Sequence, residues 1–415
     1  MKNKTNVGLW DIKKIYKNPM SMVLIGLVLL CVGITFYFNN QTSKVISFES
    51  TIAKEIKNYK LGIAVLEKEI RSGSFSDQQK AMRRNDIKLS QKLLKRDLSI
   101  QKYLASKKWS QAYALRLKTI DMDKKLNQNE TTDPTRKPLE NAIERERLRF
   151  LALKKRNVQK YNEDFSANGT GFFLWTWQNI IPVLLTLVSV YIAVNLFGES
   201  YRSRINVSLL IPQLELVINM WHIGITWIVS SVLLLMTSLL TLSTGTIVNG
   251  FGSLNYPVLF YELPTMSMKF NDLYQILLPS FCLQAISSLF ILVFVMLICS
   301  IAKNKMASLF ISLISTIGLF LLTSTVDPLK KIGELLPTTY LQSVSVTTGA
   351  TAYSLNNPRI TFSMGIIMCS LALVVLIVLI SLISYFRRIR TARNQNSIES
   401  PYTDTSHNPM LTNCH

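Results

Sequence analysis

Apolar residues are gathered into six long runs, and one polar block separates the first run from the others. Each run is long enough to cross the roughly 30 Å hydrocarbon core of a bilayer. The pattern therefore predicts six membrane-spanning helices, near residues 19–38, 172–198, 219–248, 273–301, 306–326 and 360–386. None of these runs contains Asp, Glu, Lys or Arg in its core.

The polar block, residues 39–171, reads as helix throughout. Its first helix carries an apolar seam whose members are spaced alternately by four and three residues, as in a coiled coil; the seam is Ile52, Ile56, Tyr59, Ile63, Leu66 and Ile70. A break follows at residues 72–74, and Ser76 can cap a second helix that runs to about residue 105. Further helices are predicted over 109–126 and 139–165, with a loop at 127–138. Because the chain leaves and re-enters the membrane on one side, we expect four antiparallel helices or two long interrupted ones.

Basic residues at the ends of the runs orient them. Clusters of Lys and Arg lie before the first run, after the second, between the fourth and fifth, and after the sixth. If the chain crosses the membrane six times, all four clusters lie on the same side of the membrane, and that side is therefore expected to be cytoplasmic. Long domains escape this rule, so the polar block is expected outside the cell although it is basic. The predicted fold class is an all-α polytopic membrane protein with six transmembrane helices and an extracellular antiparallel helical, coiled-coil-like domain. Its expected parts are a cytoplasmic amphipathic interface helix (1–18), the first transmembrane helix (19–38), the extracellular helical domain (39–171), transmembrane helices two to six (172–390) and a disordered cytoplasmic tail (391–415).

Charge is concentrated in the polar block. The chain has 46 Lys and Arg against 25 Asp and Glu, a net charge of +21, and residues 39–171 hold 29 and 16 of these, a net charge of +13. This distribution favours a membrane protein over a soluble nucleic-acid binder, so no nucleic acid is expected as a partner. Two interpretations of the basic block stay open: a solvated helical stalk, or a surface for anionic lipid headgroups, wall polymers or an acidic substrate. The block has no cysteine, which favours a bacterial cell membrane over a eukaryotic secretory route.

The sequence predicts no catalytic or metal site. His222, His407 and His415 are far apart, and His222 beside Trp221 fits an interfacial position near the end of a run. The spans lack the mid-membrane charges that ion-coupled carriers use, and no phosphate-binding loop of the form G-x-x-x-x-G-K-[S/T] occurs. If the chain pumps a substrate, a separate ATPase has to act on it from the cytoplasm.

After the second run come the acidic Glu199, a basic stretch with Arg202, the apolar pair Leu209 and Leu210, and Pro212. This order resembles the coupling helix of ABC-2-type transporter permeases, in which an acidic residue is followed by a small or basic stretch, an apolar pair and a Ser/Pro break. Arg204 and Ile205 replace the glycine and threonine that are common there. The resemblance implies that the segment near 199–212 docks on an ATPase through Glu199, Tyr201, Arg202, Arg204, Leu209, Leu210 and Pro212.

Two further segments agree with this resemblance. Residues 8–19 are amphipathic, and the family's interfacial helix would place Leu9, Trp10, Ile12, Ile15 and Tyr16 in the inner interface before the turn at Pro19. Residues 327–345 resemble the family's short external re-entrant helices, with Leu336, Pro337 and Tyr340 as the expected external gate.

The expected function is that of the permease subunit of an ATP-driven ABC exporter for an amphipathic or hydrophobic cargo, such as a peptide, antibiotic or lipid-like molecule. The expected partners are cytoplasmic ABC ATPase subunits, a second permease copy or a paralogue, and the lipid bilayer. The chain itself is expected to be no enzyme and to bind no cofactor, because ATP and Mg²⁺ would be bound by the ATPase. The alternative, a different class of protein, is a membrane sensor or scaffold that binds a ligand or partner through its extracellular helices without transport.

Overall fold

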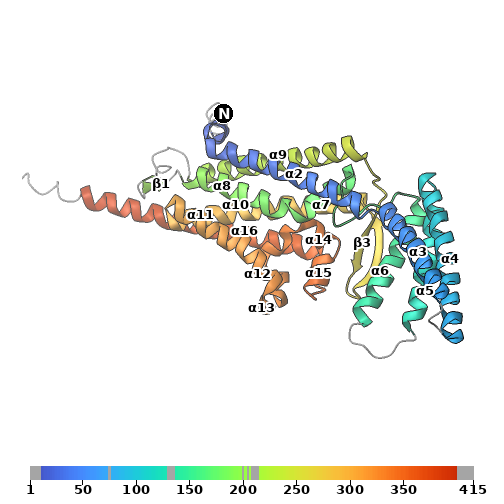
Figure 1. Cartoon of the computed structure of the whole chain (residues 1–415). Coiled ribbons are helices and arrows are strands. Elements are labelled where there is room, and N and C mark those ends of the chain that lie inside the picture. The colour runs from blue at the N-terminus through green and yellow to red at the C-terminus, as the bar shows by residue number, and fades with distance from the viewer. Residues whose placement is uncertain are drawn as a thin grey trace, which may run out of the picture.

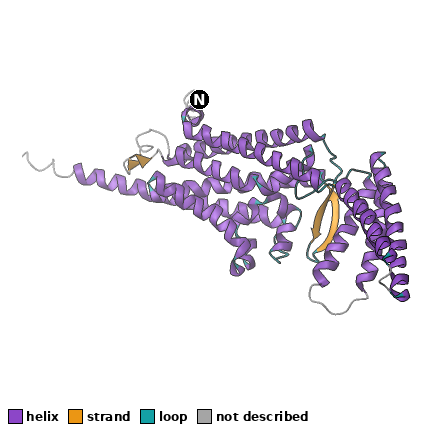
Figure 2. Cartoon of the chain, viewed as in Figure 1, coloured by secondary structure: helices purple, strands orange, loops and turns teal. Residues whose placement is uncertain are grey.

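The computed structural model describes residues 11–72, 76–128, 136–198, 201–202, 205–206 and 215–399. Long helices dominate, and they form two parts that meet at a narrow junction (Figures 1 and 2). One part is a bundle of long apolar helices. The other is the polar block, which lies beyond one end of that bundle.

The described residues contain six helices long and apolar enough to cross a membrane, as the pattern predicts. A multi-pass membrane protein is therefore the fold class that the structure supports. The long elements of this part are α2 (Pro19–Val45), α8 (Ile181–Gly198), α9 (Glu215–Asn249), α10 (Tyr274–Ala302), α11 (Lys305–Leu313) with η2 (Ile314–Gly318) and α12 (Leu319–Thr325), and α16 (Phe362–Glu399). The buried core lies on α8 and α10, while α2 and α16 expose most of their apolar side chains, as helices that face lipid do.

The second predicted span is not one helix. It divides at Ile180 into α7 (Gly169–Asn179) and α8. The cause is Pro182, which has no amide hydrogen to donate to the carbonyl four residues earlier and whose ring crowds that carbonyl. The membrane-crossing candidate is therefore Ile181–Gly198 alone. α7 packs against α9 on the side of the polar block.

Within its described residues the polar block contains four helices: α3 (Phe48–Arg71), α4 (Asp77–Ala105), α5 (Trp109–Gln128) and α6 (Arg136–Arg156). The predicted even count is confirmed, and Ser76 caps α4 as expected, in a capping box with Gln79. In the predicted seam Ile52 and Ile56 are buried and the other members are half-buried. We call residues 48–156 the inserted domain.

The core of the inserted domain lies at its end nearest the spans. Phe48, Tyr113 and Phe150 meet there with ring centroids 5.3 to 5.9 Å apart, and Ile52, Ile100 and Leu153 are fully buried around them. The far ends of α3 and α4 expose most of their side chains. Burial is therefore greatest where the inserted domain joins the rest of the chain.

One expectation about this part is wrong. The last helix ends at Arg156 rather than Phe165, because Asn157 adopts a left-handed backbone conformation (φ 50°) and residues 158–168 run irregularly to α7.

The connection between the third and fourth spans, for which the sequence predicts no element, contains a β-hairpin of β3 (Pro257–Glu262) and β4 (Ser267–Asp272). The hairpin is a small addition to a fold that is otherwise mainly helical. β4 alternates the exposed Ser267 and Lys269 with the half-buried Met268 and Phe270, whereas β3 is at least half-buried along most of its length and shows no alternation.

Short helices connect the fifth and sixth spans, as the sequence predicts, and they continue to residue 354 rather than 345. They are α13 (Asp327–Lys331), η3 (Gly333–Leu335), η4 (Pro337–Leu341), α14 (Ser343–Thr347) and α15 (Ala350–Ser354). η4 and α14 pack against α10, and α15 lies beside β3 (Figure 1). We call residues 327–354 the short-helix segment.

Candidate functional site

The segment predicted to couple to an ATPase lies mostly outside the described residues. Tyr201 and Arg202 form β1 (Tyr201–Arg202), which pairs antiparallel with β2 (Ile205–Asn206). At these four positions the backbone is extended, whereas the sequence predicts a helix there. The antiparallel pairing of the two strands satisfies their backbone hydrogen bonds. The other predicted coupling residues fall outside the described residues: Glu199, Arg204, Leu209, Leu210 and Pro212.

The predicted interface helix is present over residues 11–17. It ends at Asn18, whose side chain accepts a hydrogen bond from the Met20 amide and so caps α2, with Pro19 at the start of that helix as expected. Ile15 is buried against the bundle, whereas Ile12 and Tyr16 are exposed. Leu9 and Trp10 lie outside the described residues.

A buried hydrogen-bonded contact between Asp11 and His222, which the sequence did not predict, joins this helix to α9. His222 Nδ1 lies 2.6 Å from Asp11 Oδ2, and Asp11 is fully buried. His222 is therefore buried in a contact between two segments, and its expected position at the membrane interface stays a prediction. Asn195 of α8 is also buried, and neither polar atom of its side chain has a hydrogen-bond partner among the described residues. This end of the bundle thus combines a buried contact between two titratable side chains with polar groups that lack a hydrogen-bond partner.

The predicted gate residues lie together in the short-helix segment. Tyr340 is fully buried, and its hydroxyl donates to the carbonyl of Glu334 at 2.7 Å. Leu336 and Pro337 are half-buried beside it. The segment is fastened to α10 by two hydrogen bonds, from Ser287 Oγ to the Tyr340 carbonyl and from Ser343 Oγ to Gln284 Oε1.

An apolar cavity of about 270 Å³ opens between α8, α9 and α10. Leu185, Leu234 and Phe281 line it, together with small polar side chains such as Ser230 and Ser288. Trp227 forms part of the wall and donates its indole hydrogen to the Ala285 carbonyl. No charged side chain lines this cavity.

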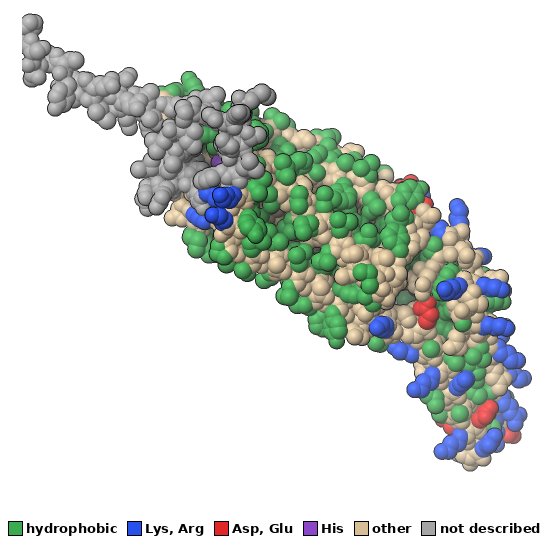
Figure 3. All heavy atoms as spheres, turned by 90° about the horizontal axis from the view of Figure 1, so that it is seen from above, with side chains coloured by type: hydrophobic (Ala, Val, Ile, Leu, Met, Phe, Trp, Pro, Cys, Tyr) green, Lys and Arg blue, Asp and Glu red, His purple; other side chains and the backbone are tan. Residues whose placement is uncertain are grey.

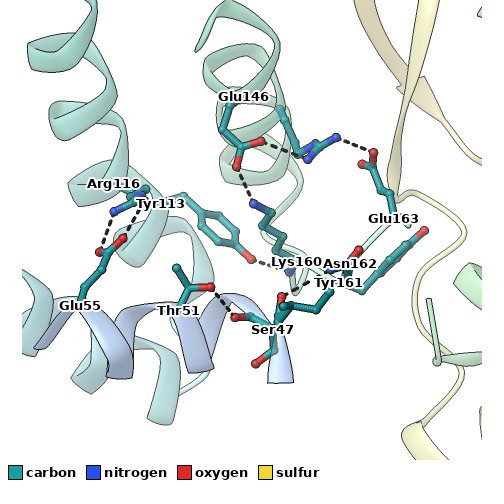
Figure 4. A network of polar contacts seen from close by, with 12 residues as sticks. Ser47, Thr51, Glu55, Tyr113, Arg116, Glu146, Lys160, Tyr161, Asn162 and Glu163 are labelled. Carbon is teal, nitrogen blue, oxygen red and sulfur yellow. Dashed lines mark hydrogen bonds and ion pairs between the residues drawn. The ribbon is translucent and has the colours of Figure 1, made fainter. Parts of the chain in front are cut away.

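A second, polar cavity of about 340 Å³ lies where the inserted domain meets the spans (Figure 4). Its wall contains a chain of ion pairs: Lys160 Nζ lies 2.6 Å from Glu146, Glu146 lies 3.1 Å from Arg149, and Arg149 lies 2.5 Å from Glu163. We call these four residues the junction network. Tyr113 extends it, because its hydroxyl donates to the Val158 carbonyl and accepts from the Lys160 amide.

The junction network perturbs the acidity of its members. Burial tends to raise the pKa of Glu146, but Lys160 and Arg149 outweigh it and hold that pKa below its usual value. Burial lowers the pKa of Lys160, and Glu146 offsets only part of this effect. Burial raises the pKa of Glu163, with Arg149 opposing it. On acidification Glu163 therefore takes up a proton before Glu146 does.

The junction also ties the inserted domain to the hairpin and, through it, to the short-helix segment. Tyr161 and Tyr256 stack with ring centroids 3.6 Å apart, and Arg156 forms an ion pair with Asp272 of β4. On the other side of the hairpin, the Tyr261 ring stacks on Tyr353 and the Tyr261 amide donates to the Thr348 carbonyl. A continuous set of contacts thus runs from α6 to α15.

Neither the buried contact between Asp11 and His222 nor the junction network follows from sequence spacing, because their members are far apart along the chain. The only signal in the sequence is composition: an ionisable residue in or beside an apolar run, and four acidic residues among the many basic ones of 144–164.

No cluster of His, Cys, Asp and Glu suited to a metal ion occurs among the residues that the structure describes. No protein-family model matches the chain, and no curated protein or solved structure matches it either.

Proposed function

We propose that the chain is the membrane-spanning permease subunit of an ATP-driven exporter for an apolar or amphipathic cargo. The observation that carries the proposal is the short-helix segment, which packs between α10 and α16 with Tyr340 at its centre. Irregular backbone is tolerated within a bilayer only where protein covers it or where it lines a water-filled cavity, so short helices packed among the spans are suited to line or close a path. In this proposal the inserted domain lies outside the cell, the short-helix segment lies at the external end of the spans, and both termini lie in the cytoplasm.

The apolar cavity supports the nature of the cargo. Its walls carry aliphatic and aromatic side chains and a few hydroxyls, but no charge that could hold an ion. A cavity of 270 Å³ is close to the lower end of the volumes of ligand pockets, about 300 Å³. An apolar part of a larger cargo would enter it from the bilayer between α8, α9 and α10.

The energy source in this proposal is a separate ATPase that docks at the opposite end of the bundle. The buried pair of Asp11 and His222 supports a mechanical role for that end, since it fixes the interface helix to α9 beside Phe197 at the end of α8. Movement of a docked ATPase would then be passed to the spans through these contacts. A second copy of the chain, or a related permease, would complete the path.

The test is co-purification in detergent of the full chain with the ATPase encoded beside it, followed by ATPase measurements. Replacement of Arg202, Leu209 and Leu210 by alanine together should release the ATPase, whereas replacement of the exposed Lys57, Lys60 and Lys118 should not. An ATPase that stays bound to the triple coupling variant contradicts the docking assignment. ATP hydrolysis stimulated only by soluble polar compounds contradicts the apolar cargo.

The junction cavity favours a second candidate, a receptor that binds a ligand outside the cell without transporting it. Its charged wall and its contacts with the hairpin would let a ligand act on the spans. Under this alternative no ATPase co-purifies with the chain. The same experiment therefore separates the two functions.

A further inference from the structure

α4 carries a row of basic side chains along its outer face. It contains eight Lys and Arg against three Asp and Glu. At 100° per residue, six of the eight fall within an arc of about 120° and extend over about 33 Å of helix. They form the α4 basic face: Lys80, Arg84, Lys88, Lys92, Lys95 and Lys102.

These cations are accessible and have no ion-pair partner within the part of the chain that the structure describes. All except the half-buried Lys80 are exposed. The two other basic residues of α4 differ from them: Arg83 pairs with Glu69, and Arg96 pairs with the fully buried Asp97. The α4 basic face thus consists of the cations that the fold itself does not neutralise.

The arrangement works against the stability of the helix. Lys80, Arg84, Lys88 and Lys92 follow one another at intervals of four residues, which puts like charges side by side. Like charges at this spacing repel one another and destabilise a helix. Bound negative charge would remove this repulsion, so the pattern is typical of a surface that binds an anion.

The position of α4 decides which kind of anion it meets. α4 packs on α3 and α5, while α6 is the helix of the domain that contacts the hairpin. α4 is therefore the outermost layer, and its buried residues Asp97, Ile100 and Leu104 lie on the side opposite the basic face. Figure 1 shows α4 at the end of the molecule farthest from the spans, and Figure 3 shows blue side chains along that edge.

We propose that the α4 basic face binds a linear polyanion, a polymer with repeated phosphate or carboxylate groups, that lies outside the membrane. Cations four residues apart are separated by about 6 Å along the helix axis, so a flexible chain of closely spaced anions can contact several of them at once. The headgroups of the membrane that the protein spans are a poorer partner, because the basic face points away from that bilayer. The proposal is independent of transport.

The experiment measures binding of inorganic polyphosphate to the full-length protein in detergent at several salt concentrations. The test variant combines Arg84→Gln, Lys88→Gln, Lys92→Gln and Lys95→Gln. The control variant removes the same charge from exposed lysines on the other three helices: Lys57→Gln, Lys60→Gln, Lys118→Gln and Lys154→Gln. Thermal unfolding and helix content of both variants are compared with those of the unmodified protein.

We expect the test variant to bind at least tenfold more weakly and the control variant less than threefold more weakly. The slope of log affinity against log salt should fall by about 0.7 for each phosphate that the variant no longer neutralises, as for single-stranded nucleic acids. Equal weakening in both variants would overturn the proposal, because it would show diffuse attraction to a basic domain. So would absence of binding to polyphosphate, or preferential binding to vesicles of anionic lipid, which would indicate a membrane partner instead.

Discussion

Lys160 offers the sharpest test of how the inserted domain is held at the junction. Its ammonium group lies 2.6 Å from Glu146 Oε1 and 4.5 Å from the centroid of the Phe150 ring. The substitution Lys160→Met keeps the length and most of the apolar stem of the side chain while it removes the charge. The variant therefore isolates the ion pair and the cation–π contact from the packing of the chain.

The size of the effect follows from partial burial. Exposed ion pairs contribute about 0–1 kcal/mol, whereas removal of one member of a buried pair costs about 3–5 kcal/mol. The side chains of Lys160 and Glu146 retain 17% and 34% of their exposure, so the pair lies between these limits. Arg149 still neutralises part of the charge on Glu146. With about 0.5–1 kcal/mol for the cation–π contact, we expect the junction to lose about 2 kcal/mol.

The loss depends on pH through Glu146. The folded protein holds the pKa of this residue below its ordinary value of about 4.3. Between the two values the unfolded chain binds more protons, so this contribution is complete above the ordinary pKa and disappears as the pH falls through the folded one. The difference between the unmodified protein and Lys160→Met should therefore be largest near neutral pH and shrink below about pH 4.

The assay is amide hydrogen exchange of α6 and residues 157–168 in the full-length protein, which reports the free energy of local opening. The control is Lys154→Met on the exposed side of α6, since Lys154 has no ion-pair partner among the described residues. If both variants change the opening free energy by the same amount within about 0.5 kcal/mol, the junction does not depend on this charge. A pH-independent difference would refute the role of Glu146.

Two further predictions concern the bundle. Gly365→Ala puts a methyl group 2.6 Å from the Tyr340 ring, so it should lower the free energy of unfolding by about 1–3 kcal/mol, as measured by thermal unfolding in detergent. The control Gly33→Ala, whose methyl group meets no atom within 4 Å, should leave the free energy of unfolding unchanged. An equal effect of both variants would contradict the packing of the short-helix segment. His222→Ala leaves Asp11 buried without its partner and should speed proteolysis of the interface helix by more than tenfold, as expected for a loss of about 3–5 kcal/mol. The double variant with Asp11→Asn should recover part of this loss, and no recovery would show that the charge of Asp11 is not the cause.

Local patterns account for most of the secondary structure. Runs of about 20 apolar residues predict the spans, because a helix alone satisfies its backbone hydrogen bonds in lipid. The cap at Ser76, the end of α3 at Arg71 and the turn at residues 106–108 all follow from residues within a few positions. These features depend on neighbours in the chain, which the sequence shows directly.

The candidate sites depend on contacts that no spacing shows. Asp11 and His222 are separated by 211 residues, and Arg156 and Asp272 by 116. Each member alone resembles an ordinary polar residue at the end of a helix. Only the packing of the spans makes Asp11 a buried charge that needs a partner.

The sequence by itself determined that this protein has six apolar spans and a basic helical insertion after the first of them, because periodicity and capping are local and the bilayer fixes the length of a span. Tertiary structure alone decided that α6 stops at Arg156, that a β-hairpin fills the connection between the third and fourth spans, and that the inserted domain is joined to the short-helix segment through it. It also decided the direction in which the α4 basic face points. The physical reason is that burial, and with it the cost of a charge or an unpaired backbone group, is a property of surfaces brought together by the fold.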